Sequence, residues 1–204
     1  MKTYTITKVS GAPDWNAVPA LAIDDLYRDP APQVKAFAQI AYGDEALFAR
    51  LTLEAPVIRA EETGKYGMPC EDSCLEFFFS PMEGDVRYLN FEFNANKCLF
   101  LGMGSCIEDL VRLVPDEEPI EELFRPETVV SETGFEITYQ IPYAFVRRFF
   151  PGFAPASGKT MRANCFTCAD NTEPPHYLCW SPVVTRPEPR TFHWPYDFGQ
   201  MIFE

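Results

Sequence analysis

Histidine is scarce in this chain of 204 residues. Its only two histidines, His176 and His193, lie in the proline-rich last quarter. A Gly-x-Ser-x-Gly motif is missing too, so the sequence carries no signature of a serine nucleophile with a histidine base. These shortages favour a protein that binds its ligand without catalysing a reaction on it.

Long apolar runs are also missing. No segment approaches the ~18 consecutive apolar residues of a transmembrane helix, and residues 1–7 lack the apolar stretch of a signal peptide. The seven cysteines are odd in number, and several lie within apolar runs. This indicates reduced, buried thiols rather than a disulfide framework. We therefore expect a cytoplasmic protein without membrane contact.

Basic residues are few compared with acidic ones. The chain has 17 Lys and Arg against 30 Asp and Glu, a net charge of −13. Such a field repels nucleic acid and anionic membrane surfaces. It allows a neutral ligand such as a sugar and attracts divalent cations, although an acidic surface also serves solubility alone. We expect a mono- or oligosaccharide partner and no nucleic-acid or membrane partner.

Aromatic residues are plentiful, with 18 Phe, 9 Tyr and 3 Trp, and such side chains suit pleated, half-buried surfaces. Alternating runs bounded by turn residues predict strands at 3–9, 35–42, 45–54, 74–80, 86–94, 97–103, 134–141, 161–168, 177–180 and 200–203. Gly43-Asp44 predicts a hairpin between the second and third of these. Residues 55–73 and the acidic stretch 115–128 are expected to be connections.

Helix signals are limited to two places. Pro142 suits the first position of a helix over 143–150, and residues 119–124 allow at most one helical turn. Many short strands and one short helix predict an all-β protein. We expect a single domain over residues 1–204, an antiparallel β-sandwich of the jelly-roll or immunoglobulin-like kind.

Cys165-Phe166-Thr167-Cys168 matches the Cys-x-x-Cys pattern of zinc and redox sites. A second pair at the same spacing is missing, and on a strand residues three apart face opposite ways. We interpret both thiols as core residues.

Polar residues alternate with large apolar ones from Tyr88 to Asn94. Leu89, Phe91 and Phe93 share one face of this predicted strand, and Tyr88, Asn90, Glu92 and Asn94 share the other. The polar row could bind sugar hydroxyl groups or could be a solvated outer face. Glu76, in the nearly continuous run Leu75-Glu76-Phe77-Phe78-Phe79, is expected close to a covered face.

Exposed tryptophan rings are common platforms for sugars. Trp180 ends an apolar strand and fits either the core or a binding surface, whereas Trp194 lies in the proline-bounded aromatic loop Phe192-His193-Trp194-Pro195-Tyr196. Open rings at Trp180 and Trp194 are the condition on which a sugar platform depends.

Several motifs together resemble the family 9 carbohydrate-binding modules and their bacterial relatives. They are Glu71-Asp72-Ser73-Cys74-Leu75-Glu76 with Phe77-Phe78-Phe79-Ser80-Pro81, then Tyr88 to Asn94, the early hairpin Ala36 to Leu53, Gly134 to Pro142, and Asp197 to Phe203. The likeness extends over most of the chain, and the order of the motifs is more specific than any one of them.

This resemblance implies a β-sandwich related to the DOMON superfamily and a sugar-binding role in the breakdown of polysaccharides. Members of the family clamp a saccharide end between two Trp rings, and some carry structural calcium. Glu76 matches a carboxylate of the family's site, Trp194 the second clamp, and Tyr66 stands where the first clamp Trp is expected. Glu92 replaces a residue that is often basic. The residues expected to bind sugar are Tyr66, Glu76, Glu92, Asn94, Trp180 and Trp194.

Two alternatives belong to other functional classes. DOMON relatives include haem-binding electron carriers, for which His193 with Met68 or Met103 could ligate iron. A pair of carboxylates such as one containing Glu76 could instead hydrolyse glycosides. Calcium is a possible cofactor, for which Asp24-Asp25 and Glu83 with Asp85 are acidic enough, although no EF-hand spacing is present.

Overall fold

The computed structural model describes residues 1–28, 33–115, 119–189 and 191–204. Part of the acidic connection expected at 115–128, residues 116–118, therefore lies outside the described residues. Within them the α-helices have four residues each, α1 (Ile120–Leu123) and α2 (Tyr143–Val146). None of the described helices has the length and apolar character to cross a membrane.

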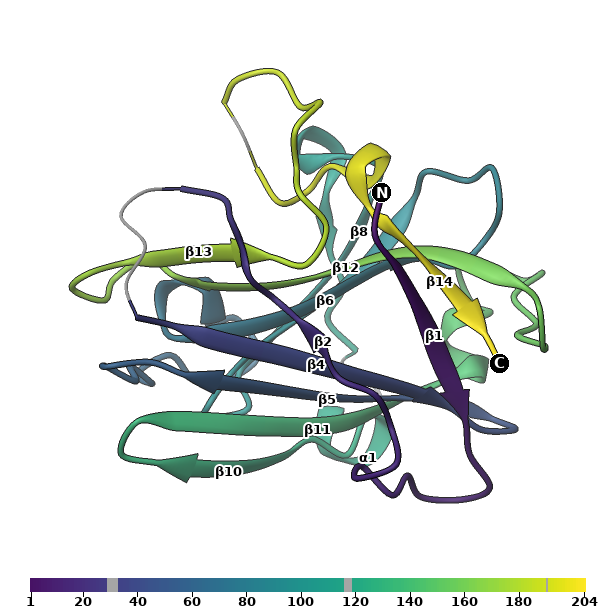
Figure 1. The fold of residues 1–204 in the computed structure, drawn as a ribbon, viewed down its shortest axis with the longest axis horizontal. Helices are drawn as coiled ribbons and strands as arrows, with labels where there is room; N and C mark the ends of the chain where they lie inside the picture. Colours follow the sequence, from purple (N-terminus) through teal and green to yellow (C-terminus); the bar gives the residue numbers. More distant parts are fainter. Residues whose placement is uncertain (29–32, 116–118, 190) are drawn as a thin grey trace.

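The fourteen strands of the described residues form one continuous sheet that curls into two layers (Figure 1). The back layer contains β10 (Glu127–Ser131), β11 (Gly134–Pro142), β5 (Ala46–Glu54), β4 (Lys35–Tyr42) and β2 (Leu21–Ala22). The site layer contains β14 (Gly199–Phe203), β12 (Thr160–Ala169), β6 (Cys74–Ser80), β7 (Tyr88–Asn94), β8 (Leu99–Gly104), β9 (Val111–Arg112), β13 (His176–Cys179) and β3 (Asp25–Leu26). Three short 3-10 helices lie between strands, at Pro69–Glu71, Ile107–Asp109 and Pro195–Asp197.

Strand β1 (Thr3–Lys8) joins the layers, and it corrects the expectation of a wholly antiparallel fold. It pairs in parallel with β14, where Thr3 lies beside Gln200, and in parallel with β4, where Thr7 lies beside Ala41. Its partners are distant in sequence or separated by a long connection, so no tight turn fixes its direction. The sandwich is confirmed, but its sheet is mixed.

The core lies between the layers and is built from the alternation that the sequence predicts. Leu51 and Ile137 of the back layer and Phe77 and Phe91 of the site layer are fully buried in one cluster. The rings of Phe91 and Tyr139 meet across the layers with centroids 5.9 Å apart. This interior core fixes one face of β6, β7 and β12.

The opposite face of the site layer is covered as well. A second cluster contains Cys74 and Phe78 of β6, Phe166 and Cys168 of β12, and residues from the segment after β13, among them Phe198. All seven residues of β6 and all seven of β7 are buried for this reason. The polar row from Tyr88 to Asn94 is therefore not a solvated outer face, and the thiols of Cys165 and Cys168 diverge as predicted.

The remaining differences from the predicted elements are local. The helix expected over 143–150 is α-helical only at Tyr143–Val146, and the expected turn at 119–124 forms a second helix, α1. Strands β2, β3 and β9 have two residues each, too few for a periodic pattern to show. Strand β10 is largely exposed at the sheet edge, and only its first two residues fall within the stretch expected to be a connection.

Candidate functional site: a pocket on the site layer

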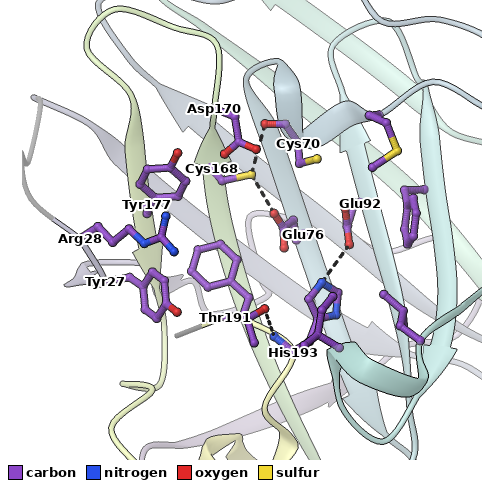
Figure 2. A pocket seen from close by; sticks show the side chains of 15 residues that line it. Tyr27, Arg28, Cys70, Glu76, Glu92, Cys168, Asp170, Tyr177, Thr191 and His193 are labelled. Carbon is purple, nitrogen blue, oxygen red and sulfur yellow. Dashed lines mark hydrogen bonds and ion pairs between the residues drawn. The ribbon is translucent and has the colours of Figure 1, made fainter. Parts of the chain in front are cut away.

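A cavity of about 320 Å³ opens on the covered face of the site layer (Figure 2). This volume is at the low end of small-molecule pockets. The lining side chains come from five regions that are distant in sequence, listed here in chain order: Tyr27 and Arg28; Met68, Cys70 and Glu76; Glu92, Phe100, Ile107 and Leu110; Cys168, Asp170 and Tyr177; and Thr191, Phe192 and His193. Curling of the sheet brings them together.

Two carboxyl groups form the floor of the pocket. Glu76 on β6 and Glu92 on β7 are cross-strand partners in register, and they are only 2% and 5% exposed. Their neighbours Leu75, Phe77, Phe91 and Phe93 occupy the interior core. The two-residue period of a strand therefore directs both carboxyls to the pocket side.

Burial raises the pKa of both carboxyls. For Glu76, burial is the main cause, and a hydrogen bond from the thiol of Cys168 to Oε1, at 3.0 Å, opposes it. For Glu92, burial acts together with the nearby Glu76, and a bond from Asn90 Nδ2, at 2.7 Å, opposes them. Adjacent carboxyls in one dry site do not both ionise readily. The floor therefore offers an O–H donor as well as acceptor oxygens near neutral pH.

His193 forms a fixed wall beside the carboxyls. Its Nδ1 lies 2.8 Å from the hydroxyl of Tyr88, and its Nε2 lies 4.0 Å from Glu92 Oε1. Burial lowers the pKa of His193 to about 4, so the ring is neutral near neutral pH. A neutral imidazole can give or accept a hydrogen bond, which suits a hydroxyl-bearing ligand.

Aromatic side chains form the other walls. The guanidinium of Arg28 lies 5.6 Å from the ring centroid of Tyr27 and 5.1 Å from that of Tyr177. Phe192 stacks on Phe166 with centroids 4.3 Å apart, and Phe100 also lines the pocket. Flat apolar walls above a polar floor allow stacking and hydrogen bonding at once.

The structure brings two of the six predicted residues, Glu76 and Glu92, into the pocket. Trp180 is not available there: it is 4% exposed and packs edge-on to Tyr4 in the interior core. A Cβ added at Gly199 would lie 2.5 Å from the Trp180 ring, so the backbone of β14 closes over it. The expectation of an open Trp180 ring is wrong, because the ring packs in the interior core against Tyr4 and beneath the backbone of β14.

Asn94 is buried and fully engaged in the fold. Its Nδ2 donates to the carbonyl of Glu62 and to Asp72, at 2.8 and 2.7 Å. Its Oδ1 accepts from the backbone N–H of Asn96 and Cys98. The amide thus ties the connection before β6 to the turn after β7 and does not line the pocket.

The last two predicted residues lie near the pocket without lining it. Tyr66 is 65% exposed, two residues before the lining residue Met68. Trp194 is half-buried and follows His193; its Nε1 donates to Thr185, and the guanidinium of Arg186 lies 4.8 Å from its ring centroid. One face of the Trp194 ring is therefore occupied by a cation.

The residues suggested as haem ligands lie partly in the pocket, and those suggested for calcium lie outside it. His193 and Met68 line the pocket, whereas Met103 packs against the interior core. Three of the four acidic residues suggested for calcium are held by cations: Lys2 pairs with Asp24 and Asp25, and Arg87 with Asp85. These carboxylates do not fit a calcium site.

Sequence reasoning missed most of the pocket walls. Tyr27, Arg28, Asp170 and Tyr177 come together because β13 pairs with both β12 and β3. No local pattern predicts that pairing, since β3 has only two residues. Cys168 was accessible to reasoning, because strand alternation places it on the same face as Phe166 and away from Cys165.

Comparison with known protein families gives a match over most of the chain. A family model for carbohydrate-binding family 9 matches residues 14–203. The chain belongs to this family. Comparison with curated protein sequences gives no match.

Three solved structures have a similar fold over the whole chain. A protein from Bacteroides uniformis ATCC 8492, provisionally described as carbohydrate-binding, is 28% identical with a TM-score of 0.82, and the match covers 100% of this chain and 99% of that one. A family 9 module from Caldicellulosiruptor kristjanssonii was solved with cellotriose and with glucose. In both cases it is 14% identical with a TM-score of 0.66, covering 100% of this chain and 94% and 96% of the module. At that identity the likeness to the module shows the fold.

Proposed function

We propose that the chain binds a saccharide in the pocket on the site layer, without catalysing a reaction on it. The observation that carries this proposal is the in-register, buried pair Glu76 and Glu92 at the floor of a pocket with aromatic walls. Family membership supports it, as do the ligands of the C. kristjanssonii module, cellotriose and glucose.

The chemistry of the pocket suits neutral sugars. Sugar hydroxyls both donate and accept hydrogen bonds, and the Glu76–Glu92 pair with neutral His193 provides both kinds of partner. The apolar face of a sugar ring can lie against Phe100 or Tyr177. The net charge of −13 disfavours anionic saccharides, and the volume of about 320 Å³ suits one or two sugar rings more than a long chain.

The arrangement of the carboxyls favours binding over hydrolysis. Glycosidases place two carboxyl groups on either side of the scissile bond. Here Glu76 and Glu92 are neighbours on adjacent strands, and both lie on the floor of the pocket. A role in carbohydrate catabolism would therefore be one of recognition. The free state of all seven cysteines supports a reducing compartment such as the cytoplasm.

Calorimetry with glucose, cellobiose, cellotriose and a panel of other neutral sugars tests the proposal. We expect saturable binding by the wild type and about a tenfold or greater loss in Glu92→Gln, since leaving a buried polar group without its hydrogen-bond partner costs about 1–3 kcal/mol. Glu127→Gln, an exposed position on β10 of the back layer, is the matched control and should bind as the wild type does.

Four results would contradict the proposal. Lack of binding to every sugar at millimolar concentration, or equal binding by Glu92→Gln, would remove the pocket as a sugar site. Turnover of chromogenic glycosides that is lost in Glu76→Gln would identify a hydrolase instead. A Soret band in the purified protein would favour the haem-carrier alternative.

A further inference from the structure

Two thiols and a carboxyl group meet beneath the pocket. Cys74 on β6 lies directly opposite Cys168 on β12 in the antiparallel register, and Glu76 is two residues along β6 on the same face. Their three potential ligand atoms, two Sγ and one carboxylate oxygen, all lie within 4.8 Å of one another. In the described part of the chain, this is the one group of three or more such side chains with that spacing.

We propose that Cys74, Cys168 and Glu76 bind one thiophilic divalent cation of the zinc class. Zinc is held by cysteine sulfur at about 2.3 Å and by carboxylate oxygen at about 2.0–2.2 Å, so the ligand atoms of a tetrahedral site are roughly 3.5 Å apart. Cys168 Sγ and Glu76 Oε1 are already 3.0 Å apart. Small side-chain rotations therefore suffice to close the three ligands around an ion.

The choice of ion follows from the donor atoms. Calcium and magnesium are bound by oxygen ligands, whereas cysteine thiolates select zinc and related soft or borderline metals. On binding, the cation replaces the protons of the two thiols, and these protons go to solvent. The excess of negative charge on the chain favours the uptake of a cation.

Cys165, on the same strand as Cys168, provides a comparison with an ordinary buried thiol. It is fully buried, three residues before Cys168, and it lies among apolar side chains of the interior core. Cys74 and Cys168 instead share their space with a carboxyl group, in a region where the described residues show no ion pair to Glu76. A buried cluster of three potential anions is stabilised by a bound cation.

The pocket gives the cluster access to solvent and to further ligands. Cys168 and Glu76 line the cavity, and Figure 2 shows Cys70 and Asp170 beside them at one end of it. The thiol of Cys168 donates to the carbonyl of Cys70 at 3.7 Å, and the N–H of Asp170 donates to the same carbonyl at 3.0 Å. Cys70 and Asp170 lie outside the group of ligand atoms within 4.8 Å of one another, so a water molecule entering from the pocket would complete the coordination.

Metal titration of the fully reduced protein tests this inference directly. The probes are Zn²⁺ in competition with a chromophoric chelator and Cd²⁺ with its thiolate charge-transfer band. We expect one tight equivalent in the wild type and a loss of about a hundredfold or more in Cys74→Ala and in Cys168→Ala, because each removes one of three protein ligands. Cys165→Ala, a buried thiol of the same strand on the opposite face, should bind as the wild type does.

Three outcomes would rule out the proposed metal site. Failure of the reduced wild type to bind an equivalent, unchanged affinity in Cys74→Ala, or equal loss in Cys165→Ala would overturn the site. If an alanine variant does not fold, Glu76→Gln keeps the side-chain shape and should weaken binding at least about tenfold. Glu76 belongs to both proposals and Cys168 lines the pocket, so Cys74→Ala is the variant that separates them: Cys74 does not line the pocket, and this variant can lose metal uptake while it keeps sugar binding.

Discussion

Gly199 and Trp180 show how a single residue decides whether an aromatic ring is a binding platform or part of the core. The backbone of β14 approaches the ring so closely that only a residue without Cβ fits there. The sequence Tyr177-Leu178-Cys179-Trp180 is compatible with either location, because a strand end has no periodicity beyond its last residue. Trp180 therefore could not be assigned from sequence.

Gly199→Ala tests this packing. A Cβ would lie 2.5 and 2.7 Å from two Trp180 ring carbons and 3.0 Å from the carbonyl oxygen of Lys2. We expect the free energy of unfolding to fall by about 1–3 kcal/mol, the usual effect of an overpacked core, as measured by urea denaturation. Trp180→Phe should recover part of the loss in a double-mutant cycle, and purely additive effects would show that the two residues do not clash.

For Glu76 and Glu92, strand alternation in the sequence was enough to predict which face of the strand each side chain occupies. Their large apolar neighbours fix which face is the core, so the two carboxyls had to lie together on the other face. What alternation could not show is that this face is covered. That depends on the segment after β13, whose Val183, Phe192 and Phe198 pack on it from far along the chain.

At the scale of structural elements, the connection before β6 has little regular secondary structure, and hydrogen bonds hold it in place. Asp72, fully buried, accepts bonds from the backbone N–H of Glu61 and Glu62. Arg112 on β9 donates to the carbonyls of Lys65, Tyr66 and Gly67, at 3.1, 3.1 and 2.7 Å. The sequence predicted a long loop here; one anchor, Asp72, lies near the end of the loop itself, whereas the other, Arg112, lies on β9 and gave no local signal.

Arg112→Lys should loosen this connection. A lysine ammonium cannot reproduce the planar fork that reaches three successive carbonyls. We expect backbone amides around residues 64–68 to exchange with deuterium about tenfold faster, since each lost hydrogen bond is worth about 1 kcal/mol. Arg87→Lys, whose guanidinium pairs locally with Asp85, is the control. Unchanged exchange would mean that the segment is held by other contacts.

At the scale of the whole molecule, His176 is buried and His193 is largely buried, and both are neutral near neutral pH. Burial lowers the pKa of His176 and that of His193 to about 4 from the ordinary value of 6.5. The unfolded chain therefore binds more protons than the folded chain between pH 6.5 and 4. By linkage, folding stability falls as the pH is lowered through that window and is not affected by these groups above it.

His176→Gln isolates one of these two contributions. The wild type should lose up to about 3 kcal/mol more than the variant between pH 6.5 and pH 4, as measured by urea denaturation at several pH values. The comparison with the variant cancels the titration of carboxyl groups, which acts over the same range. Parallel pH profiles of the two proteins would contradict the assignment of a buried, neutral His176.

The sequence was enough to predict the class of the fold, but not how the sheet closes into two layers. Hairpins such as β4–β5 follow from local turn chemistry, whereas β1 pairs in parallel with β14 at the other end of the sequence and with β4 across a long connection. No sequence period records such a pairing, which depends on the net packing of both layers. This is why the sheet turned out to be mixed.

The narrow junction at β1 has a consequence for how the molecule fluctuates. β1 shares two residue pairs with β4 and four with β14, so few backbone hydrogen bonds couple one layer to the other. Side-chain packing in the shared interior core therefore holds the two layers together, and local opening is expected to begin at exposed edges such as β10. The lining residues of the pocket belong to the site layer and its adjoining segments, so fraying of the exposed edge at β10 leaves the recognition surface assembled.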